Sequence, residues 1–256
     1  MRLKDKVIIV TGSTSGIGQA IVERAIAEGA RVLIHGIDRA AGEKLALTLG
    51  SAAKFHCDDL LDPASPARII AAAVQAFGRI DALVNNAAIV VRSTLATATL
   101  SAFERTIAIN LRAPFFLIQA AFPHLKATEG CVLNIGSINA HSGESTLLDY
   151  SISKGGLQTL SRNLANAHGI DRVRVNHLNV GWVLTAREYA DQQRYGLPAN
   201  WPEMVPAVFA PSGRLLLPAD IAAAAIYWLG DESRPVTGSV VELEQFSVIG
   251  RNAVKV

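Results

Sequence analysis

The chain carries a tyrosine and a lysine four positions apart, Tyr150 and Lys154, in the stretch GSINAHSGESTLLDYSISKGG. The spacing predicts that both side chains lie on one face at the start of a helix. A tyrosine with its ordinary pKa of about 10 is a poor acid or base at neutral pH. A nearby ammonium favours the phenolate, so we expect Lys154 to lower the Tyr150 pKa and allow proton transfer at about pH 7 to 8.

A second group of residues suits the binding of a phosphate. The stretch TGSTSGIGQA at 11–20 follows the apolar run VIIV and precedes an amphipathic segment. At a strand-to-helix turn the first amides of the helix are unpaired and the helix dipole is positive, so a phosphate binds there if the backbone can approach closely. Gly12, Gly16 and Gly18 permit that approach. Their spacing differs from G-x-G-x-x-G, and a tight turn without a ligand is the alternative for the motif alone.

Six motifs in order make the chain resemble the short-chain dehydrogenase/reductase family over essentially its whole length. TGSTSGIG resembles the coenzyme turn of that family, and NNAA at 85–88 resembles the motif after its fourth strand. IAIN supplies Asn110, GS supplies Ser137, YSISK supplies Tyr150 and Lys154, and Asp59 fits an acidic residue near the adenine. The resemblance implies an α/β fold, a doubly wound and mostly parallel sheet with helices on both faces.

The resemblance also implies a reaction, hydride transfer between NAD or NADP and a secondary alcohol or ketone. Tyr150 would exchange a proton with the substrate oxygen, and Ser137 would hydrogen-bond the same oxygen. Lys154 would hold the nicotinamide ribose, and Asn110 would support Lys154 through a water. Such donors suit the chemistry, because charge builds on the substrate oxygen in the transition state. The family usually forms tetramers, so we expect a homotetramer.

The expected cofactor contacts follow from the same resemblance. They are Gly12, Ser13, Ser15, Gly16, Ile17, Gly18, Asp38, Arg39, Asp59, Leu60, Asn86, Ala87, Tyr150, Lys154, Gly181, Val183 and Thr185. Thr185 keeps the position that would touch the nicotinamide carboxamide.

The choice between NAD and NADP depends on RVLIHGIDRAAGE, which begins at residue 31. Asp38 lies at roughly the spacing of a ribose-binding acid, whereas His35 and Arg39 could meet a 2′-phosphate. Gly36 would leave space for that phosphate, so the residues favour NADP over NAD. The alternative is that Asp38 and Arg39 only form the solvated start of a helix.

The expected substrate site departs from the usual family pattern. NVGWVLT places Trp182 after a glycine, and TGSVVELEQF ends in an acidic residue, Gln245 and Phe246. Both departures resemble a bacterial subgroup associated with sugars and polyols. Aromatic faces cover C–H surfaces while polar groups bind hydroxyls. We expect substrate contacts from Ser137, Asn139, His141, Tyr150 and Trp182, with Glu144, Arg187 and Gln192 as further polar candidates; a core role for Trp182 is the alternative.

Short apolar runs predict the strands that position these residues. They lie at 6–10, 31–34, 54–57, 81–84, 131–135 and 173–180, with a last one in SVVELE and helical spacing between them. PADIAAAAIYWL at 218–229 predicts the last helix. We expect one domain over 1–256. Its irregular stretch 186–216, rich in proline and aromatic residues, would form a substrate-binding loop or lid.

Composition excludes several classes of protein. A formal net charge of +2, spread along the chain, does not suit a nucleic-acid binder. No apolar run suits a signal peptide or a membrane span, so we expect a cytoplasmic enzyme with a small-molecule substrate and no membrane partner. Cys57 and Cys131 have no metal-like spacing to each other or to the histidines, so we expect buried thiols and no metal site.

Single motifs of the chain also occur in hydrolases. SISK matches a Ser-x-x-Lys acylation motif, but its partner motifs are missing, and GSTSG has threonine where a hydrolase needs serine. Both hydrolase interpretations fail. Two further functions stay open: a non-catalytic NAD(P)-binding sensor on the same fold, and a reductase of another carbonyl class such as 3-oxoacyl or steroid compounds.

Overall fold

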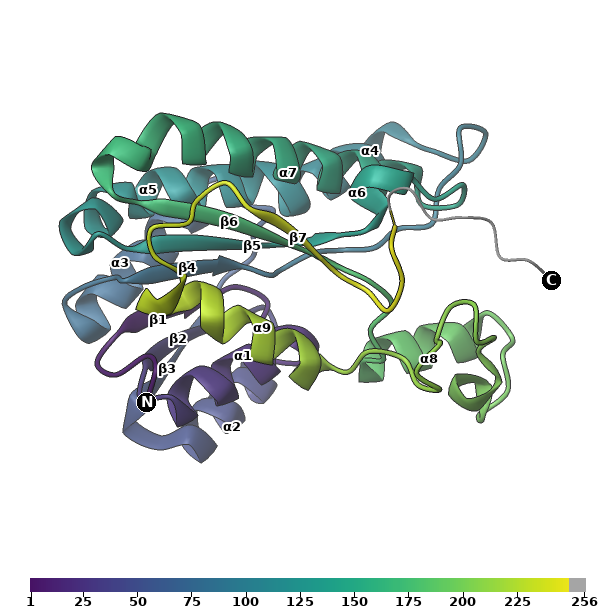
Figure 1. Ribbon diagram of the computed structural model, residues 1–256, viewed down its shortest axis with the longest axis horizontal. Coiled ribbons are helices and arrows are strands. Elements are labelled where there is room, and N and C mark those ends of the chain that lie inside the picture. The colour runs from purple at the N-terminus through teal and green to yellow at the C-terminus, as the bar shows by residue number, and fades with distance from the viewer. Residues whose placement is uncertain (249–256) are drawn as a thin grey trace.

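In a computed structural model of the chain, which describes residues 1–248, seven parallel strands form one sheet in the order β3-β2-β1-β4-β5-β6-β7 (Figure 1). The strands are β1 (Val7–Val10), β2 (Arg31–Gly36), β3 (Ala53–Cys57), β4 (Ala82–Asn85), β5 (Cys131–Ser137), β6 (Arg174–Val180) and β7 (Val240–Leu243). The chain winds outward from β1 in one direction and then in the other. Ligands of such sheets bind beyond the carboxyl ends of the strands, where the direction changes.

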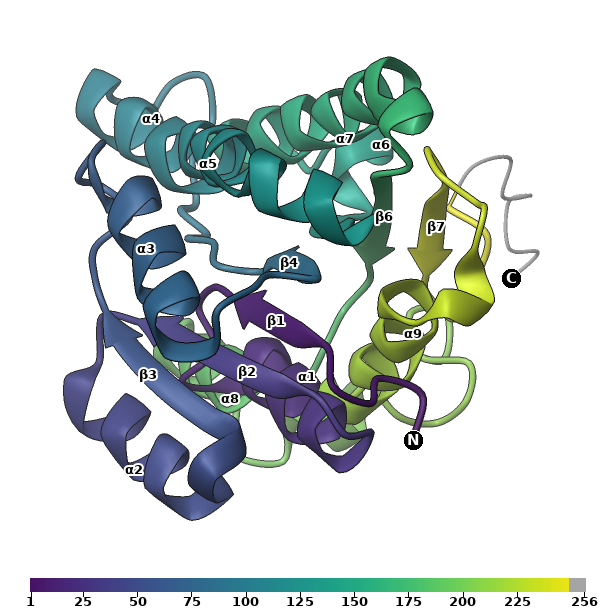
Figure 2. The same ribbon diagram turned by 90° about the vertical axis from the view of Figure 1, so that its left-hand side faces the viewer.

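Helices cover both faces of the sheet (Figure 2). One face carries α1 (Gly16–Ala27), α2 (Arg39–Leu49) and α9 (Pro218–Leu229), and the other carries α3 (Ser65–Phe77), α5 (Ala113–Thr128) and α7 (Leu148–His168). The remaining helices are α4 (Leu100–Ile107), the one-turn α6 (Asn139–Ser142) and α8 (Ala186–Arg194). Figure 1 shows α6 and α8 beyond the carboxyl ends of the strands.

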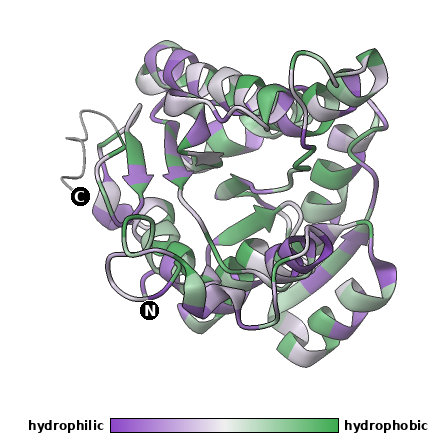
Figure 3. Ribbon diagram, turned by 90° about the vertical axis from the view of Figure 1, so that its right-hand side faces the viewer, coloured by the Kyte–Doolittle hydropathy of each residue, from purple (hydrophilic) through white to green (hydrophobic). Residues whose placement is uncertain are grey.

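The apolar strands, such as β1, are continuous runs of apolar residues because helices cover both faces of the sheet. All four residues of β1 are fully buried, and each face of the sheet has its own hydrophobic cluster. Figure 3 shows hydrophobic residues along the central strands. The doubly wound, single-domain fold expected from the sequence is confirmed. The last eight residues of the chain, 249–256, lie outside the residues that the structure describes.

The expected elements agree with the observed ones to within a residue or two, with one exception. Each predicted strand forms, and α9 has the predicted bounds, with Asp220 accepting a hydrogen bond from the Leu217 amide at 2.8 Å. The stretch 186–216 is less irregular than expected, because it contains α8. This helix has no buried residue and therefore no apolar stripe to reveal it. Thr185 and Glu188 form a Thr-x-x-Glu start signal that would have predicted it.

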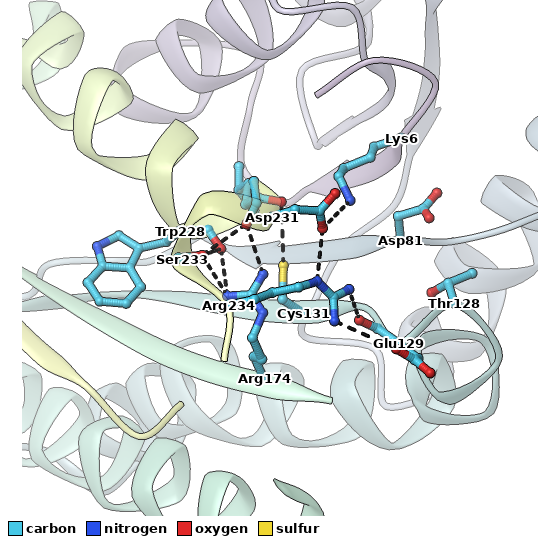
Figure 4. A network of polar contacts seen from close by, with 12 residues as sticks. Lys6, Asp81, Thr128, Glu129, Cys131, Arg174, Trp228, Asp231, Ser233 and Arg234 are labelled. Carbon is cyan, nitrogen blue, oxygen red and sulfur yellow. Dashed lines mark hydrogen bonds and ion pairs between the residues drawn. The ribbon is translucent and has the colours of Figure 1, made fainter. Parts of the chain in front are cut away.

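A buried arginine organises the edge where the strands begin (Figure 4). Arg174, at the start of β6, donates to the carbonyls of Trp228 and Gly230, each at 3.2 Å, and to Ser233 Oγ at 2.8 Å. These carbonyls end α9, where the helix dipole is negative. Around this arginine, Lys6 and Arg234 both pair with Asp231. The network thus ties β6 to the end of α9 at the edge opposite the carboxyl ends of the strands.

Both cysteines are free thiols. Cys131 is buried, which raises the pKa of its thiol, and Cys57 is half-buried with its Sγ 3.7 Å from the Ile37 carbonyl oxygen. Within residues 1–248, no helix is both long enough and apolar enough to cross a bilayer.

Candidate active site

A cavity of about 750 Å³ opens at the carboxyl ends of β5 and β6. Ser137 is the last residue of β5, and Tyr150 stands in the first turn of α7; both line the cavity. The other predicted residues on its wall are Ile17, Asn139, Glu144, Gly181, Trp182, Val183, Thr185, Arg187 and Gln192. The fold therefore brings residues from the start of α1, from the loop after β6 and from α8 around Ser137 and Tyr150.

The Tyr150 hydroxyl is harder to ionise than the sequence suggested. Burial raises the pKa of Tyr150 to about 12, the nearby Ser137 hydroxyl lowers it, and the carboxylate of Glu188 raises it further. The expected lowering by Lys154 is wrong for this structure. Lys154 Nζ lies 5.7 Å from the centroid of the Tyr150 ring and donates to the Ile135 carbonyl at 2.8 Å.

Lys154 is buried, with 3% of its surface exposed. Burial lowers the pKa of Lys154 to about 8, because a buried ammonium loses its hydration. Desolvation thus disfavours the charged forms of Tyr150 and Lys154. The spacing of the two residues in the sequence gives no information about their burial.

Asn110 lies in a π-helical turn, Ala108–Arg112, between α4 and α5. Such turns recur at functional sites. Its amide exchanges two hydrogen bonds of 2.9 Å with the backbone of Ile89 and donates to Ser153 Oγ at 3.1 Å. Asn110 therefore joins the loop after β4 to α7 next to Lys154; the expected water between Asn110 and Lys154 stays a prediction.

A layer of buried polar residues beneath Ser137 was not anticipated. Asn179 Oδ1 accepts from the Ser137 amide at 3.1 Å and lies 2.9 Å from His177 Nε2, and Asn179 Nδ2 donates to Gln158. Burial lowers the pKa of His177 to about 3, so its ring is neutral. The signal was present in VRVNHLNV, where polar residues interrupt a strand. This layer fixes the end of β5 and hence the position of Ser137.

The glycine turn is closed from the β4 side. A Cβ on Gly12 would meet the Ala87 Cα at 2.7 Å, and one on Gly18 would meet the Gly12 carbonyl oxygen at 2.5 Å. Asn86 Nδ2 donates to the carbonyls of Thr11 and Gly12, both at 2.9 Å. Asn86 and Ala87 therefore hold the turn in place.

The start of α1 fits a phosphate-bearing cofactor. The N-cap residue Ser15 makes no side-chain cap, and the first turn contains no acidic residue. A Cβ on Gly16 would find nothing nearer than the Thr185 side chain at 3.5 Å, so this side of the turn is open. The amides of the first turn, with the positive end of the helix dipole, are thus available to an anion.

Three expectations near the cofactor region need correction. Ser13 is fully buried, and its hydroxyl donates to the Val10 carbonyl at 2.6 Å, so it is structural. Leu60 packs its side chain in the core, so its expected cofactor contact would come from its backbone and stays a prediction. His35 is buried between the Gly12 amide and the Asp58 carbonyl, and burial lowers its pKa to about 4, so it offers no charge to a phosphate. The space beside Gly36 is filled by the Thr14 side chain.

Three charged candidates remain at the surface near β2 and β3. Asp38 caps α2 by accepting from the Ala41 amide at 3.0 Å, and Arg39 reaches Glu43 at 3.4 Å with most of its side chain exposed. Asp59 is exposed and accepts from the Leu61 amide. These contacts agree with the helix-start interpretation of Asp38 and Arg39, but they leave the Arg39 guanidinium accessible.

Trp182 joins the cavity wall to the segment 186–216. Its ring stacks on Trp201 with centroids 5.7 Å apart, and its indole N–H donates to Glu188 Oε1 at 2.8 Å. Trp201 is buried in a small hydrophobic cluster separate from the main core. Trp182 is only half-buried, so it serves both the packing of this segment and the wall of the cavity.

One substrate candidate needs revision. His141 does not line the cavity; its Nε2 lies 3.6 Å from Glu242 Oε1 on β7. Asn139 and His141 are two residues apart on a single helical turn, so they point to different sides. Glu188, which sequence reasoning missed, does line the cavity. The position of Glu188 in the sequence does not predict that it lines the cavity, because this depends on where α8 packs.

The chain is similar to known proteins over nearly all of its length. Residues 12–244 match the protein family described as Enoyl-(Acyl carrier protein) reductase. Over 249 residues the chain is 33% identical to 2-(S)-hydroxypropyl-CoM dehydrogenase 3 of Xanthobacter autotrophicus, covering 95% of this chain and 96% of that protein. It is 28% identical to meso-2,3-butanediol dehydrogenase of Serratia marcescens, covering 95% of each. The crystal structure of 3-ketoacyl-(acyl-carrier-protein) reductase from Brucella melitensis, complexed with NADH, is similar with a TM-score of 0.83 and 28% identity, covering 94% and 97% of the two chains.

Proposed function

The chain belongs to the short-chain dehydrogenase/reductase family and is an NAD(P)-dependent oxidoreductase, and we propose that its substrate is the secondary alcohol or ketone of a small sugar or polyol. The observation that carries the proposal is the pairing of Ser137 and Tyr150 on the wall of one cavity, with half-buried Trp182 and several carboxylates facing the same space. A small hydroxylated molecule matches such a mixed wall, because the aromatic face covers C–H groups while polar groups bind hydroxyls.

Tyr150 and Ser137 would act on one oxygen atom of the substrate. The high pKa of Tyr150 keeps its hydroxyl protonated at neutral pH, so in the direction of reduction it can donate a proton to the oxygen that gains negative charge. Ser137 would donate a hydrogen bond to the same oxygen. Its backbone is fixed by Asn179, so this donor is in place before the reaction begins.

The cofactor would be held by the glycine turn and the start of α1. Gly12, Gly16 and the first-turn amides would bind its phosphates, and Thr185 and Lys154 would lie toward the nicotinamide end. Bound there, the nicotinamide supplies or accepts the hydride. Arg39 would favour NADP, since its guanidinium is exposed and only loosely paired with Glu43.

The segment 186–216 would act as a lid over the substrate. It supplies α8 and much of the cavity wall while packing on a small cluster of its own around Trp201. A unit with few contacts to the main core can move without unfolding the sheet.

The enzyme would assemble as a homotetramer in the cytoplasm. Large apolar side chains are exposed on α4, α5 and α7 at Leu100, Phe103, Phe115, Phe116 and Ile152. A further apolar side chain, Tyr227, is exposed on α9. An apolar face on α4, α5 and α7, with an exposed tyrosine on a helix of the opposite face of the sheet, would suit a tetramer with two kinds of two-fold interface. Two free thiols suit a reducing compartment.

The test of the proposed function is a substrate panel. Polyols, sugars, simple ketones, 3-oxoacyl compounds and hydroxysteroids are offered with NADP(H) and with NAD(H), and the absorbance of the reduced nicotinamide is followed. We expect the largest kcat/KM for a small polyol or sugar, with NADP(H). A larger value for an acyl or steroid substrate would reject the substrate class. Light scattering of the purified enzyme measures its oligomeric state.

A further inference from the structure

We propose that Glu188 selects the substrate by accepting a hydrogen bond from a second hydroxyl group, on the carbon next to the reacting carbon. The inference rests on the proposed function, since it names a feature of the substrate that the same cavity would take. It assigns a specificity role to a residue of the lid segment that lies outside the family motifs.

The first observation is that one carboxylate oxygen of Glu188 is held firmly. Trp182 Nε1 donates to Oε1 at 2.8 Å, and Gln192 Nε2 donates to the same oxygen at 2.7 Å. The backbone of Glu188 is also fixed, because its amide donates to Thr185 Oγ1 at 3.0 Å. Two side-chain donors and a helix cap thus hold the carboxylate in one position.

The second observation is that the other carboxylate oxygen of Glu188, Oε2, is an unused hydrogen-bond acceptor. Within residues 1–248 it has no hydrogen-bond partner, and it is not a buried atom, while the residue lines the cavity. The carboxylate lies close enough to Tyr150 to raise the pKa of its hydroxyl. An acceptor with an open oxygen therefore stands near the position of the reacting group.

The other carboxylates of the cavity wall differ from Glu188. The two oxygens of Glu244 accept from the amides of Trp182 and Gln245. Asp191 is paired with Arg187 and Arg194. Glu144 also has one oxygen without a partner, since Ser145 and Thr146 both donate to its Oε1, but its side chain is exposed and is held only within its own loop. Among the carboxylates of the described cavity wall, Glu188 alone combines an oxygen without a partner with an oxygen held by the Trp182 indole, and lies near enough to Tyr150 to act on its hydroxyl.

A substrate hydroxyl is the group that this arrangement fits. A hydroxyl can donate to Glu188 Oε2 while the neighbouring oxygen is bound by Tyr150 and Ser137. A substrate carboxylate or phosphate in that position would be repelled. The Trp182 ring lies beside the acceptor and can cover the C–H surface between the two oxygens. The chemical class is therefore a neutral vicinal diol or the corresponding hydroxyketone.

The experiment compares two alcohols that differ in one hydroxyl group. The kcat/KM values for 2,3-butanediol and 2-butanol are measured at one pH with wild type, Glu188→Gln and Glu188→Met. The ratio of the two values cancels any effect of the substitution on Tyr150 itself. Glu203→Gln is the matched control, because Glu203 lies on the same segment, is exposed and does not line the cavity.

We expect wild type to prefer the diol. The diol-to-alcohol ratio should fall about tenfold in Glu188→Gln, which keeps an acceptor for Trp182, and roughly 10- to 100-fold in Glu188→Met, the range of a hydrogen bond to a charged group. Glu203→Gln should leave the ratio unchanged. Circular dichroism melting of each variant reports whether it is folded.

Three results would overturn the inference. An unchanged diol-to-alcohol ratio in folded Glu188→Met would show that the carboxylate does not bind the second hydroxyl. The proposed function, oxidation of a secondary alcohol, would not be affected by that result. Preference for 3-amino-2-butanol over the diol would show that Glu188 binds a cation. Turnover of neither alcohol by wild type, with turnover of another class in the panel, would reject the proposed function and the inference together.

Discussion

Tyr150 combines a buried hydroxyl with a neighbouring negative charge, and both keep its proton in place. If this proton is transferred to the substrate, Tyr150→Phe removes only the reacting group. Turnover should then fall by roughly a hundred- to ten-thousandfold, the usual contribution of acid–base catalysis. Binding of the reduced cofactor, followed by its fluorescence, should persist. A variant with near-normal turnover would contradict the assignment.

The pH dependence of oxidation tests the electrostatics of the same residue. The Glu188 carboxylate raises the pKa of Tyr150, so Glu188→Gln should lower it. Alcohol oxidation needs the deprotonated base, and the rising limb of kcat/KM against pH should therefore move to lower pH. We would measure it with 2-butanol, which has no second hydroxyl. Glu203→Gln should leave the limb in place, and a shift to higher pH in Glu188→Gln would refute this account.

Arg39 carries the predicted preference for NADP. A guanidinium paired with a 2′-phosphate contributes roughly 1.5–3 kcal/mol. Arg39→Ala should therefore raise the KM for NADP(H) about tenfold or more and change that for NAD(H) little. Lys44→Ala, another exposed cation on α2, is the control. Equal effects on both cofactors, or a wild-type preference for NAD(H), would disprove the choice.

At the scale of elements, the segment 186–216 depends on the stacking of Trp182 on Trp201. The cluster around Trp201 is small and separate from the two clusters of the sheet. Truncating Trp182 should therefore loosen this segment and the cavity wall without unfolding the sheet.

Trp182→Ala should accordingly reduce kcat/KM for the best polyol more than it reduces stability. Truncation of a tryptophan in the main core would instead cost about 3–5 kcal/mol of folding stability. Thermal melting and kinetics of the same variant separate these outcomes. A large fall in Tm with unchanged catalysis would mean that Trp182 is only a packing residue.

At the scale of the whole molecule, Arg174 joins β6 to the end of α9 (Figure 4), at the edge of the sheet opposite the carboxyl ends of the strands. Arg174→Met would leave the Trp228 and Gly230 carbonyls without this donor in a buried site. The loss should be about 3 kcal/mol, which lowers Tm by roughly 5–10 °C. Arg172→Met, at an exposed arginine that pairs with Glu129, should change Tm little. Steady-state kinetics of Arg174→Met below its Tm should match wild type.

The sequence by itself determined the strands, the last helix, the glycine turn and the helix that carries Tyr150 and Lys154. These features depend on local periodicity and on residues close together in the chain, so spacing reveals them. The polar helix α8 was not predicted because it has no apolar stripe, although Thr185 and Glu188 mark its start.

Only the tertiary structure decided the electrostatics and the contacts of the site. Burial raises the pKa of Tyr150 and lowers that of Lys154, and burial depends on segments far apart in the chain. Long-range contacts also hold Ser13 and His141 away from their expected ligands. The Ser13 hydroxyl accepts from the His35 amide on β2 at 3.1 Å while donating to nearby Val10, and His141 lies against Glu242 on β7. The place of Glu188 in the site is seen only where α8 packs against Trp182, because no local pattern encodes a contact between a strand end and the helix that follows it.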